Sequence, residues 1–74
     1  MTATEFIKAH FQEVADNLGY KPTVESLTAN NASGKYSVEV SAEWYNPELE
    51  DMERHYFQFQ GQVSVNHFGQ WEVV

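Results

Sequence analysis

HYFQFQGQVSV, residues 55–65, alternates between two kinds of side chain. One set is apolar or glycine: Phe57, Phe59, Gly61, Val63 and Val65. The other set is polar and uncharged: Tyr56, Gln58, Gln60, Gln62 and Ser64. Because successive side chains of a β-strand point to opposite faces of a sheet, this stretch predicts a strand with one buried and one wet face. The wet face holds amides although the chain carries a formal charge of −7.

Three further stretches predict strands that complete an antiparallel sheet. GKYSVEVSAEWYN, residues 34–46, alternates in the same way as residues 55–65. QWEVV, residues 70–74, and the weaker pattern TVESLTANN, residues 23–31, supply the other two. The expected inward-facing residues of the first of these stretches are Tyr36, Val38, Val40, Ala42 and Trp44. We therefore expect one face of the sheet to need a cover.

The N-terminal residues predict an amphipathic helix over residues 3–18 that supplies this cover. Thr2 and Glu5 fit a capping box at its start. Its apolar stripe has helical spacing: Ala3, Ile7, Phe11, Val14 and Leu18. Gly19 is expected to end the helix as a left-handed cap, and Pro22 prevents its resumption.

Turn residues indicate how the strands pair. Asn66 opposite Gln70 leaves a three-residue loop whose last member, Gly69, suits a left-handed conformation. In the long hairpin, NPELEDMER, residues 46–54, is interpreted as the loop, and Trp44 is expected opposite Phe57. The same register places Tyr45 opposite Tyr56 on the wet face. Gly61 predicts either a close approach of the helix or a bulge.

These elements predict the fold class. Residues 1–74 form a single small α+β domain, with the helix on one face of a three- or four-stranded antiparallel meander in the order α-β-β-β-β. A chain of this length has no room for a second core. It holds no cysteine, which excludes a disulfide framework and thiolate metal sites. We expect a cytoplasmic protein, because the N-terminus has no signal-peptide pattern and no apolar run reaches a membrane span.

Composition also narrows the classes of function. Four Lys and Arg against eleven acids disfavour direct binding to nucleic acid. No nucleophile, phosphate-binding or metal-ligand motif occurs, so we expect no enzymatic activity, no cofactor and no metal. Asp51, Glu53 and His55 would align on one side of an extended strand, but this is a weak metal pattern. The acidic stretch from Glu48 to Glu53 has two explanations that compete with a binding role: a solvated loop, or a short helical turn opened by Pro47.

The sequence favours a small acidic protein-interaction module, an inhibitor or adaptor that engages a basic protein, including one that itself binds nucleic acid. Amides suit an interface because they cost less to desolvate than charges, although they also serve simply to avoid repulsion across strands. The predicted partner-binding residues are Glu39, Glu43, Tyr45, Glu48, Glu50, Asp51, Glu53, Tyr56, Gln58 and Gln60. The alternative is a small-ligand-binding regulatory domain, with a pocket lined by Trp44, Trp71, Phe57 and Phe11. A homodimer through the edge strand Gln70–Val74 is also expected.

Overall fold

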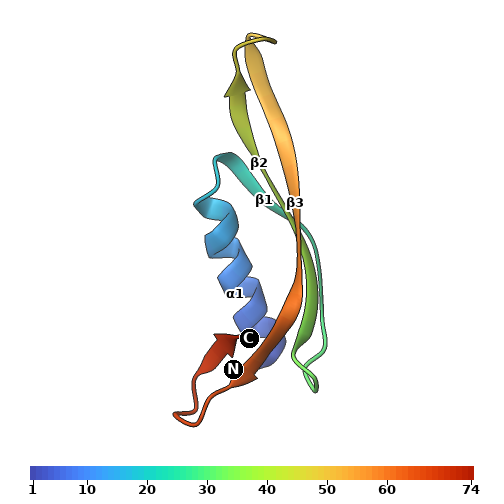
Figure 1. Cartoon of the computed structure of the whole chain (residues 1–74), viewed down its shortest axis with the longest axis vertical. Helices are drawn as coiled ribbons and strands as arrows, with labels where there is room; N and C mark the ends of the chain where they lie inside the picture. The colour runs from blue at the N-terminus through green and yellow to red at the C-terminus, as the bar shows by residue number, and fades with distance from the viewer.

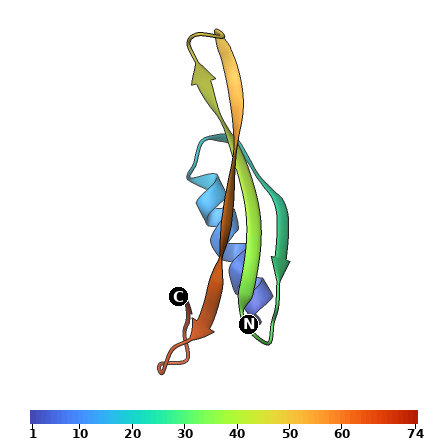
Figure 2. The same ribbon diagram turned by 45° about the vertical axis from the view of Figure 1, so that its right-hand side comes forward.

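The computed structural model describes residues 1–74 as one helix packed on one face of a four-stranded antiparallel sheet (Figure 1). The strands follow in the order β1-β2-β3-β4, so the sheet is a meander. The elements are α1 (Ala3–Asp16), β1 (Tyr20–Ala29), β2 (Lys35–Asn46), β3 (Asp51–Val65) and β4 (Trp71–Val73). This confirms the predicted α+β fold and its α-β-β-β-β order. Figure 2 shows the twist of the sheet around the helix.

The helix begins as the sequence predicts and ends slightly earlier. The Thr2 side chain accepts a hydrogen bond from the Glu5 backbone amide. The Glu5 carboxylate accepts one from the Thr2 backbone amide, which completes the capping box. The helix ends at Asp16, and its C-cap Asn17 is right-handed, so the expected left-handed cap at Gly19 is wrong. Gly19 serves a close approach instead, because a Cβ there would lie 2.8 Å from the Glu43 carbonyl oxygen.

The two faces of the sheet follow the predicted alternation with three exceptions in β2 and β3: Phe57 and Val65 on the apolar side are exposed, and Ser41 on the wet side is buried. The core joins one side of the helix to the inward positions of the sheet: Ala3, Ile7, Phe11, Ala15, Val38, Val40 and Val63. On the opposite face Gln58, Gln60 and Gln62 are exposed. Burying apolar side chains between helix and sheet is therefore the main source of stability.

The register of the long hairpin differs from the prediction. Trp44 lies opposite Glu53 instead of Phe57, and Tyr45 lies opposite Met52 instead of Tyr56. Each pairing is thus four residues closer to the turn, which has shrunk to Pro47–Glu50. The Asn46 side chain accepts from the Glu48 amide at 3.0 Å, and this bond tightens the turn. Asp51–Arg54, which the sequence suggested were loop, are therefore the start of β3, whereas Glu48 and Glu50 stay in the turn.

Gly61 lies opposite Tyr36, and the aromatic ring occupies the space above it. A Cβ at Gly61 would lie 2.6 Å from the Tyr36 hydroxyl oxygen. The Tyr36 ring also packs on Phe11, with ring centroids 5.1 Å apart. The glycine therefore makes room for a cross-strand aromatic ring rather than for the helix or a bulge.

Hydrogen bonds tie both chain ends to the sheet at the end where the helix starts. The Thr4 backbone N–H donates to the Asn31 side chain at 2.9 Å, which links α1 to the β1–β2 turn. The Trp71 indole N–H donates to the Met1 carbonyl at 3.2 Å. The predicted pairing of β3 with β4 is confirmed, including Val65 opposite Trp71 and a positive φ at Gly69.

Candidate protein-interaction surface

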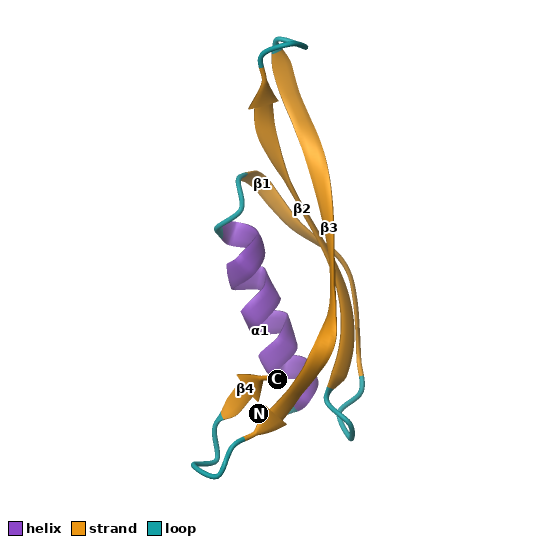
Figure 3. Cartoon of the chain, in the orientation of Figure 1, coloured by secondary structure: helices purple, strands orange, loops and turns teal.

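The β2–β3 hairpin projects beyond the end of the helix (Figure 3). β1 pairs with β2 only as far as Glu43, so the strands beyond that point form a two-stranded ribbon. The molecule measures 49 × 20 × 16 Å, and this projection accounts for its elongated shape. Residues at the tip are therefore free to reach a partner without displacing the core.

The turn at the end of this ribbon carries carboxylates that no basic side chain neutralises. Glu48, Glu50 and Asp51 are exposed, and the two ion pairs of the protein involve neither them nor any lysine. Leu49 and Tyr45 stand beside them with 62% and 60% of their surface exposed. We call these five residues the tip surface. It combines negative charge with an exposed aromatic ring, which suits contact with Arg or Lys.

Glu43 does not belong to this surface, because Arg54 binds it. The Arg54 guanidinium donates to the Glu43 carboxylate at 2.7 Å, to the Ser41 hydroxyl at 2.6 Å and to the Lys21 carbonyl at 2.8 Å. The Ser41 hydroxyl in turn donates to Glu25 at 2.6 Å and is fully buried. This network connects β1, β2 and β3 on the wet face. It could not be predicted from the sequence, because the expected register left Arg54 in a loop.

Glu53 is also separate from the tip surface. It lies on the helix side of the sheet, where it accepts from the Asn46 amide at 2.9 Å and lies 3.4 Å from His55 Nε2. Beside it, the Trp44 ring contacts both His55 and Phe57, with centroids 5.3 and 5.8 Å apart. Phe57 remains 38% exposed, although it lies opposite buried Val40.

The remaining predicted residues form a second surface, the amide row: Glu39, Tyr56, Gln58 and Gln60. Gln58 lies opposite Glu39 and donates to its carboxylate at 3.3 Å. Tyr56 is 59% exposed and lies opposite Ser41, roughly 13 Å along the strands from Tyr45. The structure therefore divides the predicted site into a tip surface and an amide row.

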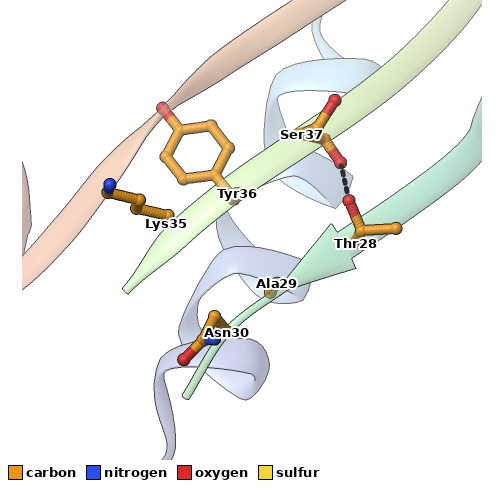
Figure 4. Close-up of a pocket in the computed structure, with 6 residues that line it drawn as sticks. All are labelled: Thr28, Ala29, Asn30, Lys35, Tyr36 and Ser37. Carbon is orange, nitrogen blue, oxygen red and sulfur yellow. Dashed lines mark hydrogen bonds between the residues drawn. The ribbon is translucent and has the colours of Figure 1, made fainter. Parts of the chain in front are cut away.

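The four aromatic residues of the alternative ligand pocket do not line one cavity. Phe11 packs on Phe59, Trp71 stacks on Phe6, and Trp44 contacts Phe57. None of the hollows in the surface is lined by more than one of the four, and Trp71 borders one beside the β1–β2 turn. Another, of about 330 Å³, is lined by Thr28, Ala29, Asn30, Lys35, Tyr36 and Ser37 (Figure 4). All six are exposed or half-buried, so this hollow is an open depression between β1 and β2.

No group of three His, Asp or Glu side chains is placed to bind a metal ion. The one helix is too short and insufficiently apolar to cross a bilayer. Comparisons with protein-family models, with curated proteins and with solved structures found no match to this chain. Its function must therefore be inferred from its own surfaces.

Proposed function

We infer that this chain is a small protein-interaction module whose tip surface binds a basic protein. The observation that supports this most directly is the position of the uncompensated carboxylates of Glu48, Glu50 and Asp51 on a projecting hairpin. An exposed projection can enter a concave site on a partner. This geometry suits an inhibitor or an adaptor better than a catalyst, since it offers no enclosed site.

The chemistry of the partner follows from that of the tip surface. Carboxylates attract Lys and Arg, and the Tyr45 ring can stack on a guanidinium while Leu49 fills an apolar recess. Proteins that bind nucleic acid are one class that fits, because their basic sites accept negative charges carried on a narrow projection. In that case the hairpin would compete with nucleic acid for the site.

Affinity capture from native lysate, with the wild-type chain and a neutral tip variant as baits, tests this function. The variant Glu48→Gln/Glu50→Gln/Asp51→Asn keeps the size of each side chain and removes three negative charges. We expect basic proteins on the wild-type bait alone, and their release as salt rises, because exposed charges are screened within about 8 Å at physiological ionic strength.

The matched control is Glu5→Gln/Glu13→Gln/Asp16→Asn, which removes the same charge from the helix. Equal loss of the captured proteins in both variants would mean that the interaction depends only on the net charge of the chain. That result would contradict a tip site. The pair Tyr45→Ala and Tyr56→Ala, tested singly, then separates the two surfaces. Only the first is expected to weaken capture.

A further inference from the structure

The outer edge of β3 has no strand beside it over most of its length. β3 runs from Asp51 to Val65 and pairs with β2 from Asp51 to Gln62. On its other edge it pairs with β4 only through Val63–Val65, and the Val74 amide adds a bond to the Gln62 carbonyl at 2.9 Å. Between the turn and that bond, this edge of β3 is open.

The hydrogen-bond pattern shows which backbone groups point outward there. The Val63 amide donates toward β2, to Gly34, whereas Asn66 donates toward β4, to Gln70. Bonds alternate along an antiparallel strand, so odd-numbered residues of β3 bond to β2 and even-numbered residues face outward. The outward-facing residues of the open edge are Met52, Arg54, Tyr56, Gln58 and Gln60. This free edge, Met52–Gln60, is roughly 30 Å long.

The other sheet edges are protected against pairing, but this one is not. β1 contains Pro22 and two register irregularities, and Lys21 has a φ of 46°. β4 has three residues. The free edge of β3 has a continuous register with β2 and contains neither proline nor lysine. An exposed edge of this length ordinarily pairs with another strand.

The distribution of charged residues along the free edge favours a second copy of the same chain as its partner. In an antiparallel pair of identical strands, a charged residue near the centre would face its own kind. The only charged residues of the free edge are Glu53 and Arg54, which lie near its tip end, and no further acid occurs before Glu72. In a chain of charge −7, the centre of this edge therefore repels a second copy little. The β3 residues of the amide row, Tyr56, Gln58 and Gln60, are uncharged, and such self-pairing requires uncharged residues at its centre.

We propose that two copies pair antiparallel through the free edges of their β3 strands, with Tyr56 opposite Tyr56 of the second copy. This register centres on the free edge and matches all five outward-facing residues. It gives about eight new backbone hydrogen bonds, because the Met52 amide already donates to the Asp51 carboxylate at 2.7 Å. It places Phe57 opposite His55 of the second copy on the helix side, where neighbouring side chains lie close together. The exposed ring of Phe57 is thereby covered. The pairing is independent of the basic partner.

Sedimentation across a concentration series, with two variants of Gln58, measures this pairing. Gln58→Pro removes an outward amide that has no partner within the chain, whereas Gln58→Ala removes the same side chain and keeps the amide. We expect a concentration-dependent dimer for wild type and Gln58→Ala. Gln58→Pro should raise the dissociation constant about tenfold or more, as expected from losing one or two hydrogen bonds. A wild-type chain that stays monomeric at hundreds of micromolar would overturn the proposal.

Two charged variants avoid dependence on a proline that could unfold the chain. In the proposed register Gln58 faces Arg54 of the second copy, whereas within its own chain it faces Glu39. Gln58→Glu should therefore tighten the dimer severalfold while lowering the stability of the monomer, and Gln58→Lys should do the reverse. Changes of dimer affinity and monomer stability in the same direction would contradict the register.

Cysteine cross-linking locates the two-fold axis, because the chain has no cysteine of its own. Hydrogen-bonded partners have Cα atoms about 5.5 Å apart, which a disulfide spans. With oxidised glutathione as the electron acceptor, Tyr56→Cys should give a covalent dimer. Gln60→Cys should not, because the two copies of residue 60 lie roughly 26 Å apart. Cross-linking of Glu72→Cys in place of Tyr56→Cys would move the dimer to the C-terminal edge and overturn the proposal.

Salt separates this pairing from binding by the tip surface. Two chains of charge −7 repel each other, so added salt should strengthen the dimer. The same salt should weaken capture of a basic partner. A dimer that forms without any captured partner would contradict the proposed function alone, and capture by a strict monomer would contradict the pairing alone.

Discussion

The two halves of the β2–β3 hairpin differ in what surrounds them. In the half beside the helix, Val38 and Val40 are buried under α1, and β1 borders β2. In the projecting half neither the helix nor β1 accompanies the strands, and Tyr45 and Leu49 are exposed. One continuous pair of strands therefore has two different roles. Its covered half stabilises the fold, and its projecting half remains available for contact.

The two halves also differ in the hydrogen bonds that connect separate elements. Thr4 to Asn31 and Trp71 to Met1 fasten the chain at the covered end. At the boundary between the halves, the Arg54 network joins three strands on the wet face. Beyond Arg54 the ribbon carries only local bonds, such as that from the Asn46 amide to Glu53. Substitutions should therefore lose their effect on stability, and gain effect on binding, toward the tip.

Phe11→Ala should have the largest effect on stability. Phe11 is buried at 3% exposure and contacts Tyr36 and Phe59, so truncation leaves a cavity between helix and sheet. We expect a loss of about 3–5 kcal/mol in the free energy of unfolding, which is most of the stability of a domain this small. Chemical denaturation measures it. Leu49→Ala at the tip is the comparison, and an equal loss there would contradict the division into halves.

Arg54→Gln should cost about 2 kcal/mol, because it removes charge-assisted bonds and leaves buried Ser41 without one of its partners. The matched control is Lys35→Gln, which makes the same change in charge at an exposed side chain without an ion pair. The control should stay within about 0.5 kcal/mol. Equal denaturation midpoints for the two variants would show that the network does not stabilise the boundary.

Gly61→Ala should cost about 1 kcal/mol through overpacking against the Tyr36 ring, which Phe11 keeps from moving freely. Combining it with Tyr36→Phe removes the hydroxyl that the new methyl group meets at 2.6 Å. The double variant should therefore lose less stability than the sum of the two single changes. If the stability losses of the two single variants simply added, the strain in Gly61→Ala would not come from contact with the Tyr36 hydroxyl.

Glu48→Gln/Glu50→Gln should have the smallest effect on stability, within about 0.5 kcal/mol, with the sign favouring the variant because like charges in one turn repel each other. Thermal unfolding at low salt detects the change. A clear loss of stability would mean that these carboxylates hold the turn together, and they would then not be free for a partner.

Much of the fold could be predicted because its signals are local. Alternation assigns the faces of β2 and β3, the capping box starts α1, and Gly69 sets the short turn before β4. The register of the long hairpin could not be predicted in the same way. A strand pattern of period two is unchanged when one strand slides by two or four residues, so only the length of the turn distinguishes the registers. Acids, which are depleted in strands, concealed that Asp51 and Glu53 belong to β3.

The candidate site was predictable to the same extent. Tyr45, Glu48, Glu50 and Asp51 are at the tip in any register, because the turn alone places them. Whether Glu43 and Glu53 are available to a partner depends on which residues lie opposite them. In the observed register Glu43 forms an ion pair with Arg54, and Glu53 lies beside His55. The free edge of β3 could not be seen in the sequence, since it arises from the shortness of β4 beside a long neighbour.

Residue-resolved amide hydrogen exchange on dilute protein most directly tests the claim that one side of β3 is fastened and the other open. The account predicts slow exchange at Phe57 and Phe59, whose amides bond to β2, and fast exchange at Tyr56 and Gln58, whose amides point outward. Raising the concentration should then slow the second pair alone. Slow exchange at Tyr56 and Gln58 in the dilute monomer would contradict the account, because that edge would already be covered within a single chain.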